Sequence, residues 1–191
     1  HEEIFNCAKS FGANVEMTRA DHKCGSDRIA EVAQRHEDFE YIVNLQGDEP
    51  MITPESIDGV ISALHNNKNA DIATLLREIK DPEEAENPNL VKCVKDENGF
   101  ALYFSRSKIP YERNANEAVF YGHIGLYGYR RDSLFKMTSL SQTMLEKAES
   151  LEQLRALQSG MRIITTVVDF IPVGIDTKED VERFKAALAK N

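Results

Sequence analysis

Two aspartates that follow strand-like segments are the side chains best suited to bind a divalent cation. Asp48 comes directly after the apolar run 41–45, and Asp176 ends the apolar segment that begins at Pro172. Ligands of open α/β sheets bind at the carboxyl ends of strands, and Mg²⁺ takes one or two carboxylates plus phosphate and water oxygens. The two aspartates could therefore share one Mg²⁺ ion. The alternatives are a surface turn at Asp48 and the N-cap of the last helix at Asp176.

Polar side chains elsewhere could bind a substrate. Ser26 and Arg28 open the predicted helix 26–35, where free backbone N–H groups and a guanidinium suit an anion. An ordinary capped helix is the alternative. His123 lies in a segment rich in glycine and tyrosine, which indicates close packing whether the imidazole is structural or contacts a ligand.

Glu152 and Gln153 lie in the predicted helix 144–159, outside the apolar stripe formed by Leu151 and Leu154. Positions off the apolar stripe of a helix usually face solvent. The local pattern therefore assigns these two residues to a solvated surface.

The elements that must position these side chains alternate between strand and helix. Thr53 followed by Pro54 is typical of a helix start, and Asn98-Gly99 predicts a tight hairpin turn. The alternation predicts an α/β fold with a mostly parallel sheet, helices on both faces and one antiparallel insertion. Predicted helices cover residues 1–10, 26–35, 54–66, 131–138, 144–159 and 177–190, and predicted strands cover 14–18, 41–45, 72–76, 89–95, 99–104, 122–129 and 162–168.

The composition narrows the class of protein. The 191 residues, 41% of them hydrophobic, fit a single compact domain with a core of its own. The net charge of −9, without a Lys/Arg stripe among aromatics, argues against a nucleic-acid partner. We expect no membrane span, because no apolar run approaches about 18 residues. We expect no signal peptide, because no charged n-region followed by an apolar h-region opens the sequence. The three cysteines are too few for a disulfide framework or a zinc site, which predicts a reducing cytoplasm.

Six motifs occur in one order and cover essentially the whole chain. They are Cys24–Glu31, Asn44–Pro50, Tyr103–Tyr111, Gly122–Tyr129, Leu151–Arg155 and Gly174–Asp180. Together they resemble the CMP-Kdo synthetase family, the 3-deoxy-D-manno-octulosonate cytidylyltransferases. The resemblance implies a Rossmann-like nucleotidyltransferase fold and a homodimer. It also implies that CTP and the eight-carbon acid sugar Kdo give CMP-Kdo and pyrophosphate with Mg²⁺, for lipopolysaccharide biosynthesis.

The resemblance also assigns roles to individual residues. Asp48 and Asp176 resemble the magnesium ligands of the family, and Arg28, Ser26 and Gln46 resemble residues around the cytidine nucleotide and the mouth of the site. We further expect residues 104–141 to depart from the main sheet and to help form a dimer interface. The residues that resemble the Kdo pocket are His123, Tyr127, Glu152 and Gln153.

One family feature has no counterpart in this sequence. The family begins with a strand and a loop of the form Ala-Arg-x-x-Ser-x-Arg-Leu-Pro-x-Lys-Pro, which cradles the triphosphate. We therefore expect the chain to enter the family pattern partway along, either because an N-terminal segment is missing from this sequence or because this is a truncated relative. Two alternative functions stay open, namely a non-catalytic truncated relative and a nucleotidyltransferase for another acid sugar such as sialic acid.

Overall fold

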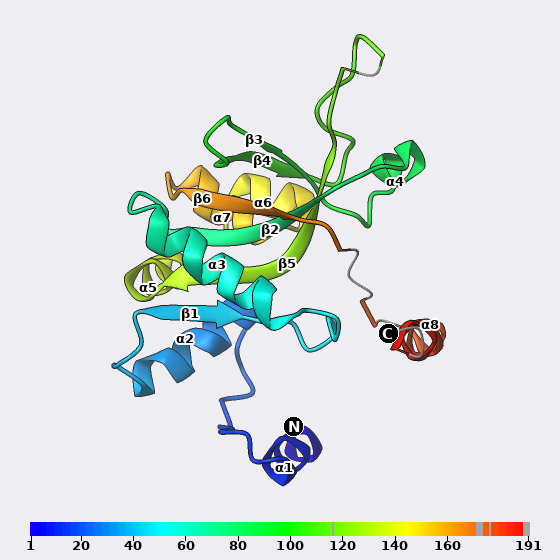
Figure 1. Ribbon diagram of the computed structural model, residues 1–191. Helices are drawn as coiled ribbons and strands as arrows, with labels where there is room; N and C mark the ends of the chain where they lie inside the picture. The colour runs from blue at the N-terminus through cyan, green and yellow to red at the C-terminus, as the bar shows by residue number, and fades with distance from the viewer. Residues whose placement is uncertain (116, 171–173, 176, 189–191) are drawn as a thin grey trace.

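The computed structural model describes residues 1–115, 117–170, 174–175 and 177–188. A six-stranded sheet forms the centre, and helices cover both of its faces (Figure 1). The strands are β1 (Tyr41–Asn44), β2 (Ile72–Glu78), β3 (Lys92–Lys95), β4 (Ala101–Ser105), β5 (Tyr121–Arg130) and β6 (Ile163–Val168). The helices are α1 (Glu2–Ser10), α2 (Gly25–Arg35), α3 (Pro54–Asn66), α4 (Pro82–Glu86), α5 (Arg131–Ser139), α6 (Met144–Glu149), α7 (Gln153–Gln158) and α8 (Lys178–Leu188).

The predicted α/β class is confirmed, but the sheet is mixed rather than mostly parallel. Its order is β4-β3-β5-β2-β6, with β1 also paired to β5. The β2–β6 pair is parallel, whereas β5 runs antiparallel to β1, β2 and β3. Parallel neighbours need a crossover connection, usually a helix. The connection from β2 to β5 instead contains the β3–β4 hairpin and a loop that returns beside the end of β2, where the Ile79 N–H donates to the Phe120 carbonyl at 2.8 Å.

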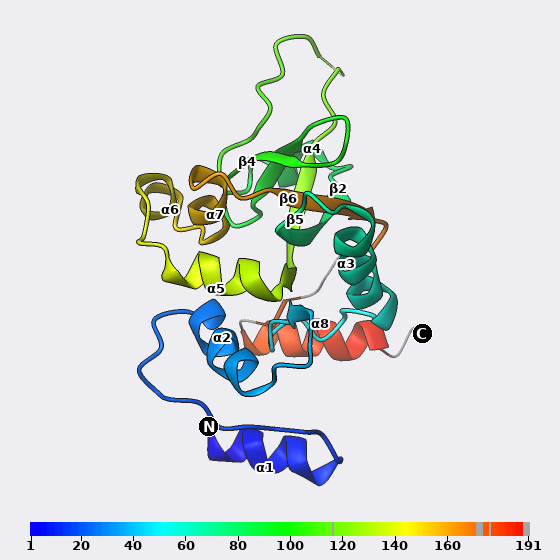
Figure 2. The same ribbon diagram turned by 90° about the vertical axis from the view of Figure 1, so that its left-hand side faces the viewer.

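The two faces of the sheet bury different helices (Figure 2). Alternate residues of β2 point to opposite faces: Leu76 joins the core beneath α2, α5 and α7, and Leu75 joins the core beneath α3. On the α3 side the backbone approaches closely, because a Cβ at Gly128 would lie 3.3 Å from side-chain atoms of Val60 and Leu64. Tight packing on both faces therefore fixes the position of β5.

The first predicted strand is absent. Residues 14–18 are extended but form no ladder with the described strands. Side chains of α2 bind this segment instead, since Arg28 donates to the Arg19 carbonyl at 2.9 Å and Arg35 donates to the Met17 carbonyl at 3.0 Å. The preceding helix α1 forms as predicted, but none of its residues is buried.

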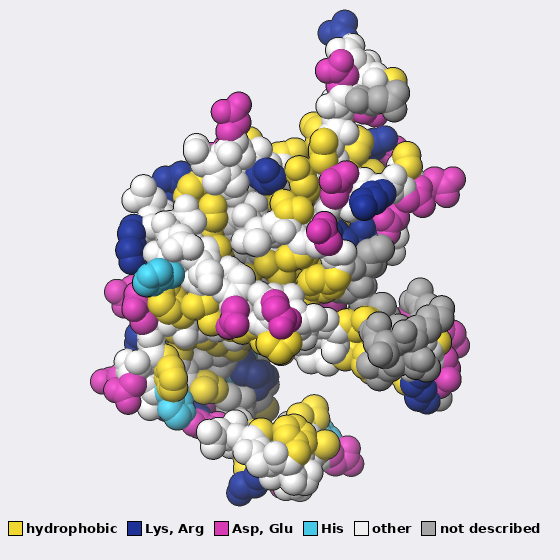
Figure 3. Space-filling model, viewed as in Figure 1, with side chains coloured by type: hydrophobic (Ala, Val, Ile, Leu, Met, Phe, Trp, Pro, Cys, Tyr) yellow, Lys and Arg dark blue, Asp and Glu magenta, His cyan; other side chains and the backbone are white. Residues whose placement is uncertain are grey.

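The hairpin, the region 104–141 and the surface charge were also predicted from the sequence. The Asn98-Gly99 hairpin is confirmed, with Gly99 at φ 85°. The expectation that residues 104–141 leave the main sheet is wrong for β5, which lies at its centre. The part that projects is the loop of which residues 106–115 and 117–120 are described (Figure 1). Among the described residues, no helix is long and apolar enough to cross a membrane. Lys and Arg side chains are scattered over the face shown in Figure 3 rather than gathered in one stripe.

Candidate functional site

A small polar cavity opens at the carboxyl end of β1. Its volume is about 180 Å³. It lies where β1, β5 and the first turns of α2 and α7 meet, so side chains far apart in the sequence converge on it. Among its lining residues are several that the sequence predicted, namely Ser26, Gln46, Tyr127, Glu152 and Gln153.

Two further cavity residues, Asn44 and Tyr129, were missed by the sequence reasoning. The Asn44 Oδ1 accepts a hydrogen bond from Gln46 Nε2 at 3.1 Å. The side chains of Asn44 and Ser26 both reach the Tyr129 hydroxyl, and burial raises the Tyr129 pKa, so the phenol stays neutral. A polar residue inside the apolar run 41–45 was the available signal, because a buried amide needs partners.

The carboxamide of Gln153 is the side chain that most clearly indicates a ligand. The residue is 4% exposed and lines the cavity. Within the described part of the chain its side chain makes no hydrogen bond. Its amide atoms are open to the cavity rather than sealed in the core. A ligand with hydrogen-bonding groups would satisfy the Gln153 amide.

His123 stands behind the cavity rather than in its lining. Its Nε2 lies 2.9 Å from Thr74 Oγ1, and its ring centroid lies 5.3 Å from that of Tyr127 and 5.1 Å from that of Phe104. Burial lowers the His123 pKa to about 4, so the imidazole is neutral near pH 7. His123 therefore contacts the Tyr127 ring, which itself lines the cavity.

The structure does not bring Arg28 to this cavity. Side chains two residues apart on an α-helix point in directions that differ by roughly 200°. Arg28 therefore lies on the opposite side of α2 from Ser26. Its guanidinium donates to the Thr18 hydroxyl and to the Arg19 carbonyl. In this position Arg28 holds the extended N-terminal segment against α2.

Asp48 lies on an exposed turn beyond β1, outside the cavity lining. Its carbonyl accepts a hydrogen bond from the Ile175 N–H at 2.8 Å, so the chain near residue 175 runs beside this turn. Asp176 lies outside the described residues, and the shared magnesium site stays a prediction. Within the described ranges, no group of three or more His, Cys, Asp or Glu side chains could hold a metal ion.

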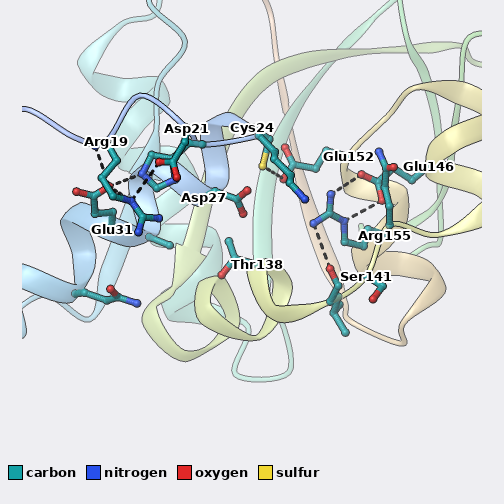
Figure 4. Close-up of a pocket in the computed structure, with 16 residues that line it drawn as sticks. Arg19, Asp21, Cys24, Asp27, Glu31, Thr138, Ser141, Glu146, Glu152 and Arg155 are labelled. Atoms are coloured by element: carbon teal, nitrogen blue, oxygen red, sulfur yellow. Dashed lines mark hydrogen bonds and ion pairs between the residues drawn. The ribbon is translucent and has the colours of Figure 1, made fainter.

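A larger groove of about 930 Å³ adjoins the cavity at Glu152, whose side chain lines both (Figure 4). Several charges in the groove are already paired. Arg155 donates to Glu146 through Nε at 2.9 Å and Nη2 at 2.5 Å, and His22 is bonded to Glu31. These pairs leave the groove poorly suited to bind a polyanion by itself.

Comparisons with known proteins show the family to which this chain belongs. A family model described as cytidylyltransferase matches residues 1–163. The 3-deoxy-manno-octulosonate cytidylyltransferase of Solibacter usitatus is 46% identical over 98% of this chain and 76% of its own length. The protein of the same name from Fusobacterium nucleatum is 42% identical over 95% of this chain and 74% of its own length. This chain belongs to the 3-deoxy-manno-octulosonate cytidylyltransferase family.

Solved structures of known proteins share the fold of this chain. A CMP:2-keto-3-deoxy-manno-octonic acid synthetase complexed with CTP matches with a TM-score of 0.94 and 39% identity, over 100% of this chain and 78% of that one. A 4-diphosphocytidyl-2C-methyl-D-erythritol synthase from Anaerococcus prevotii matches with a TM-score of 0.63 at 13% identity, which shows a common fold alone. The family and fold expected from the sequence motifs are thus confirmed.

The cavity of this cytidylyltransferase combines neutral hydrogen-bonding groups with one carboxylate. The neutral groups belong to Ser26, Gln46, Tyr127 and Gln153, and the carboxylate belongs to Glu152. Such a set can bind several hydroxyl groups at once, since amides and hydroxyls both donate and accept and a carboxylate accepts. The arrangement suits a polyhydroxylated ligand.

Proposed function

We propose that the protein is a Kdo cytidylyltransferase, which converts CTP and Kdo to CMP-Kdo and pyrophosphate. The relatives named above carry this activity in their names, and the solved relative is complexed with CTP. The observation that carries the proposal is the Gln153 carboxamide, which opens into a hydroxyl- and amide-rich cavity and makes no hydrogen bond to the described residues.

The size of the cavity favours the sugar over the nucleotide. Pockets for drug-sized ligands measure about 300–1,000 Å³, whereas this cavity measures about 180 Å³. It therefore accommodates one sugar-sized group rather than a nucleoside triphosphate. We assign Tyr127, Glu152 and Gln153 to the hydroxyl groups of Kdo, with His123 supporting the Tyr127 ring. Ser26 and Gln46, which the resemblance assigns to the cytidine nucleotide and the mouth of the site, line the same cavity.

The reaction needs no covalent bond to the protein. The anomeric oxygen of Kdo forms a bond to the α-phosphorus of CTP and loses its proton, while the bond to the bridging oxygen of the β-phosphate breaks and pyrophosphate leaves. The protein contributes by holding the anomeric oxygen in line with the α-phosphorus, which removes much of the entropic barrier. Hydrogen bonds from the cavity to the remaining hydroxyls would fix the sugar in that orientation.

Magnesium is the proposed cofactor, and Asp48 with Asp176 would hold it. A carboxylate on an exposed turn fits Mg²⁺, which needs one or two carboxylates when phosphates and water complete its shell. The Ile175–Asp48 backbone hydrogen bond supports the assignment, because it ties the chain next to Asp176 to the Asp48 turn. When bound, Mg²⁺ neutralises phosphate charge and helps activate the attacking hydroxyl.

Three wider proposals accompany the reaction. CMP-Kdo would supply lipopolysaccharide biosynthesis, and the reaction would take place in the cytoplasm, where CTP is available. The protein would act as a homodimer. The projecting loop, described at residues 106–115 and 117–120, is our candidate for the interface, because it exposes 89% of Tyr111 and 50% of Val119. A stable obligate dimer would bury well over about 1,000 Å².

A substrate panel tests the proposed activity. The product of the complete open reading frame is incubated with Mg²⁺, one nucleotide and one sugar acid, and pyrophosphate release is followed together with mass spectrometry of the product. We expect CMP-Kdo from CTP and Kdo, and little product from UTP or from sialic acid. Efficient transfer to sialic acid, or no turnover with any pair, would refute the proposal.

A further inference from the structure

We propose that Cys24 is a positioning residue for this reaction, with its thiol holding the Glu152 carboxylate where the cavity joins the groove. The inference rests on the proposed function, in which Glu152 binds the acid sugar. It extends that function to a residue outside the cavity lining.

The contact joins the starts of two helices that are far apart in the sequence. Cys24 is the N-cap of α2, and Glu152 is the N-cap of α7. The Cys24 Sγ donates to Glu152 Oε1 at 3.2 Å, and Figure 4 shows the two side chains facing each other in the groove. The thiol therefore ties the α7 corner, with Glu152 and Gln153, to α2 and its Ser26.

The cationic side chain near Glu152 is already bound to another carboxylate, so the Cys24 thiol is the group that holds Glu152. Arg155 also lies close to Glu152, but its Nε and Nη2 both donate to Glu146. Among the described side chains, Cys24 is the hydrogen-bond donor to the Glu152 carboxylate. With one oxygen fixed, Glu152 keeps Oε2 to accept a hydroxyl of the substrate.

The protonation state of Cys24 suits a donor. Burial, together with the negative charges of Glu152 and Asp27, raises the Cys24 pKa to about 11, although a backbone hydrogen bond at Asp27 opposes the shift. Tyr129 and Arg155 are the other titratable groups coupled to the thiol. The sulfur therefore keeps its proton near pH 7 and can donate it to the carboxylate.

Kinetics of two Cys24 variants test the positioning role. Cys24→Ala removes the donor, and we expect the KM for Kdo to rise about fivefold, with the KM for CTP unchanged. Cys24→Ser keeps a donor and should restore most of the lost Kdo affinity. The matched control is Cys7→Ser, because Cys7 is exposed on α1 and lies far from the cavity.

An alkylation experiment tests the contact without using activity. Iodoacetamide labelling of the Cys24 peptide is followed by mass spectrometry from pH 7 to pH 10, in wild type and in Glu152→Gln. Removing the carboxylate lowers the thiol pKa, so the variant should be labelled several-fold faster at pH 8. The labelling of Cys7 gives the internal reference for reagent reactivity.

The outcomes separate this inference from the proposed function. Identical labelling profiles in wild type and Glu152→Gln would overturn the contact. A wild-type KM for Kdo in Cys24→Ala, with an active enzyme, would overturn the positioning role alone. Absence of Kdo turnover in the wild type would overturn the proposed function and, with it, this role for Cys24, whatever the labelling shows.

Discussion

The backbone N–H of Ile175 donates to the carbonyl of Asp48 at 2.8 Å, joining two segments that are far apart in the sequence. The hydrogen bond therefore attaches the Asp48 turn to a second segment besides β1. Its partner segment leads directly into Asp176. A tertiary contact therefore holds the Asp48 turn in addition to its connection to β1.

Asp48→Asn should abolish most Kdo cytidylyltransferase activity. Asparagine suits a turn as well as aspartate does, but it lacks the charge that binds Mg²⁺. We expect a loss of about 2–4 kcal/mol of transition-state stabilisation in kcat/KM. The control is Asp58→Asn, on the exposed side of α3. Turnover that survives either the Asp48 substitution or a chelator would contradict the metal role.

Gln153→Ala should weaken Kdo binding without unfolding the protein. The substitution removes one hydrogen bond to the ligand, worth about 1.4 kcal/mol, so the KM for Kdo should rise about tenfold. Because the Gln153 carboxamide has no hydrogen bond within the described residues, the melting temperature should change little. Gln158→Ala, on the exposed end of the same helix, is the control. An unchanged KM in Gln153→Ala would remove Gln153 from the sugar site.

The stability of the protein should fall as the pH drops from about 6.5 towards 4. Burial lowers the folded-state pKa of His123 to about 4, so the unfolded chain binds the extra proton first. His123 therefore contributes stability that is present above pH 6.5 and is lost as the pH falls through this window, by roughly 2–3 kcal/mol. In chemical denaturation, His123→Gln should reduce the dependence of the free energy of unfolding on pH between 6.5 and 4. His65→Gln, in an exposed position of α3, should leave that dependence unchanged. Equal pH dependence in both variants would refute the assignment.

Arg155→Met should destabilise the fold strongly. Glu146 is 4% exposed and receives two hydrogen bonds from the Arg155 guanidinium. Removing one member of a buried ion pair leaves the other charge buried without a partner, which lowers the free energy of unfolding by about 3–5 kcal/mol. Urea denaturation should show this loss, and Glu146→Gln in the same background should recover a large part of it. A double variant as unstable as Arg155→Met would argue against a stranded charge.

The sequence predicted the local elements better than their arrangement. The hairpin at Gly99 and the helix start at Thr53 depend on neighbouring residues, and both are present. The antiparallel orientation of β5 depends on which strands become neighbours in space. The alternation of strands and helices along the sequence does not determine those neighbours. The strand expected at residues 14–18 failed for a related reason, because a strand needs a partner edge as well as strand-forming residues.

The candidate site shows the same limit. Ser26, Glu152 and Gln153 were assigned by family resemblance, although the local pattern placed the last two on a solvated surface, and all three line the cavity. Arg28 belongs to the same motif as Ser26 but faces the N-terminal segment. Motif membership thus identified the helix that matters, while helix phase decided which of its side chains reach the site.

The reversed β5 has a consequence for biosynthesis. Among the described strands, β1 pairs with β5 alone, and β2 also needs β5 along one edge. Ribosomes add roughly 5–20 residues per second, so β1 leaves the tunnel several seconds before its partner exists. During translation β1 therefore remains without its strand partner until β5 has been synthesised.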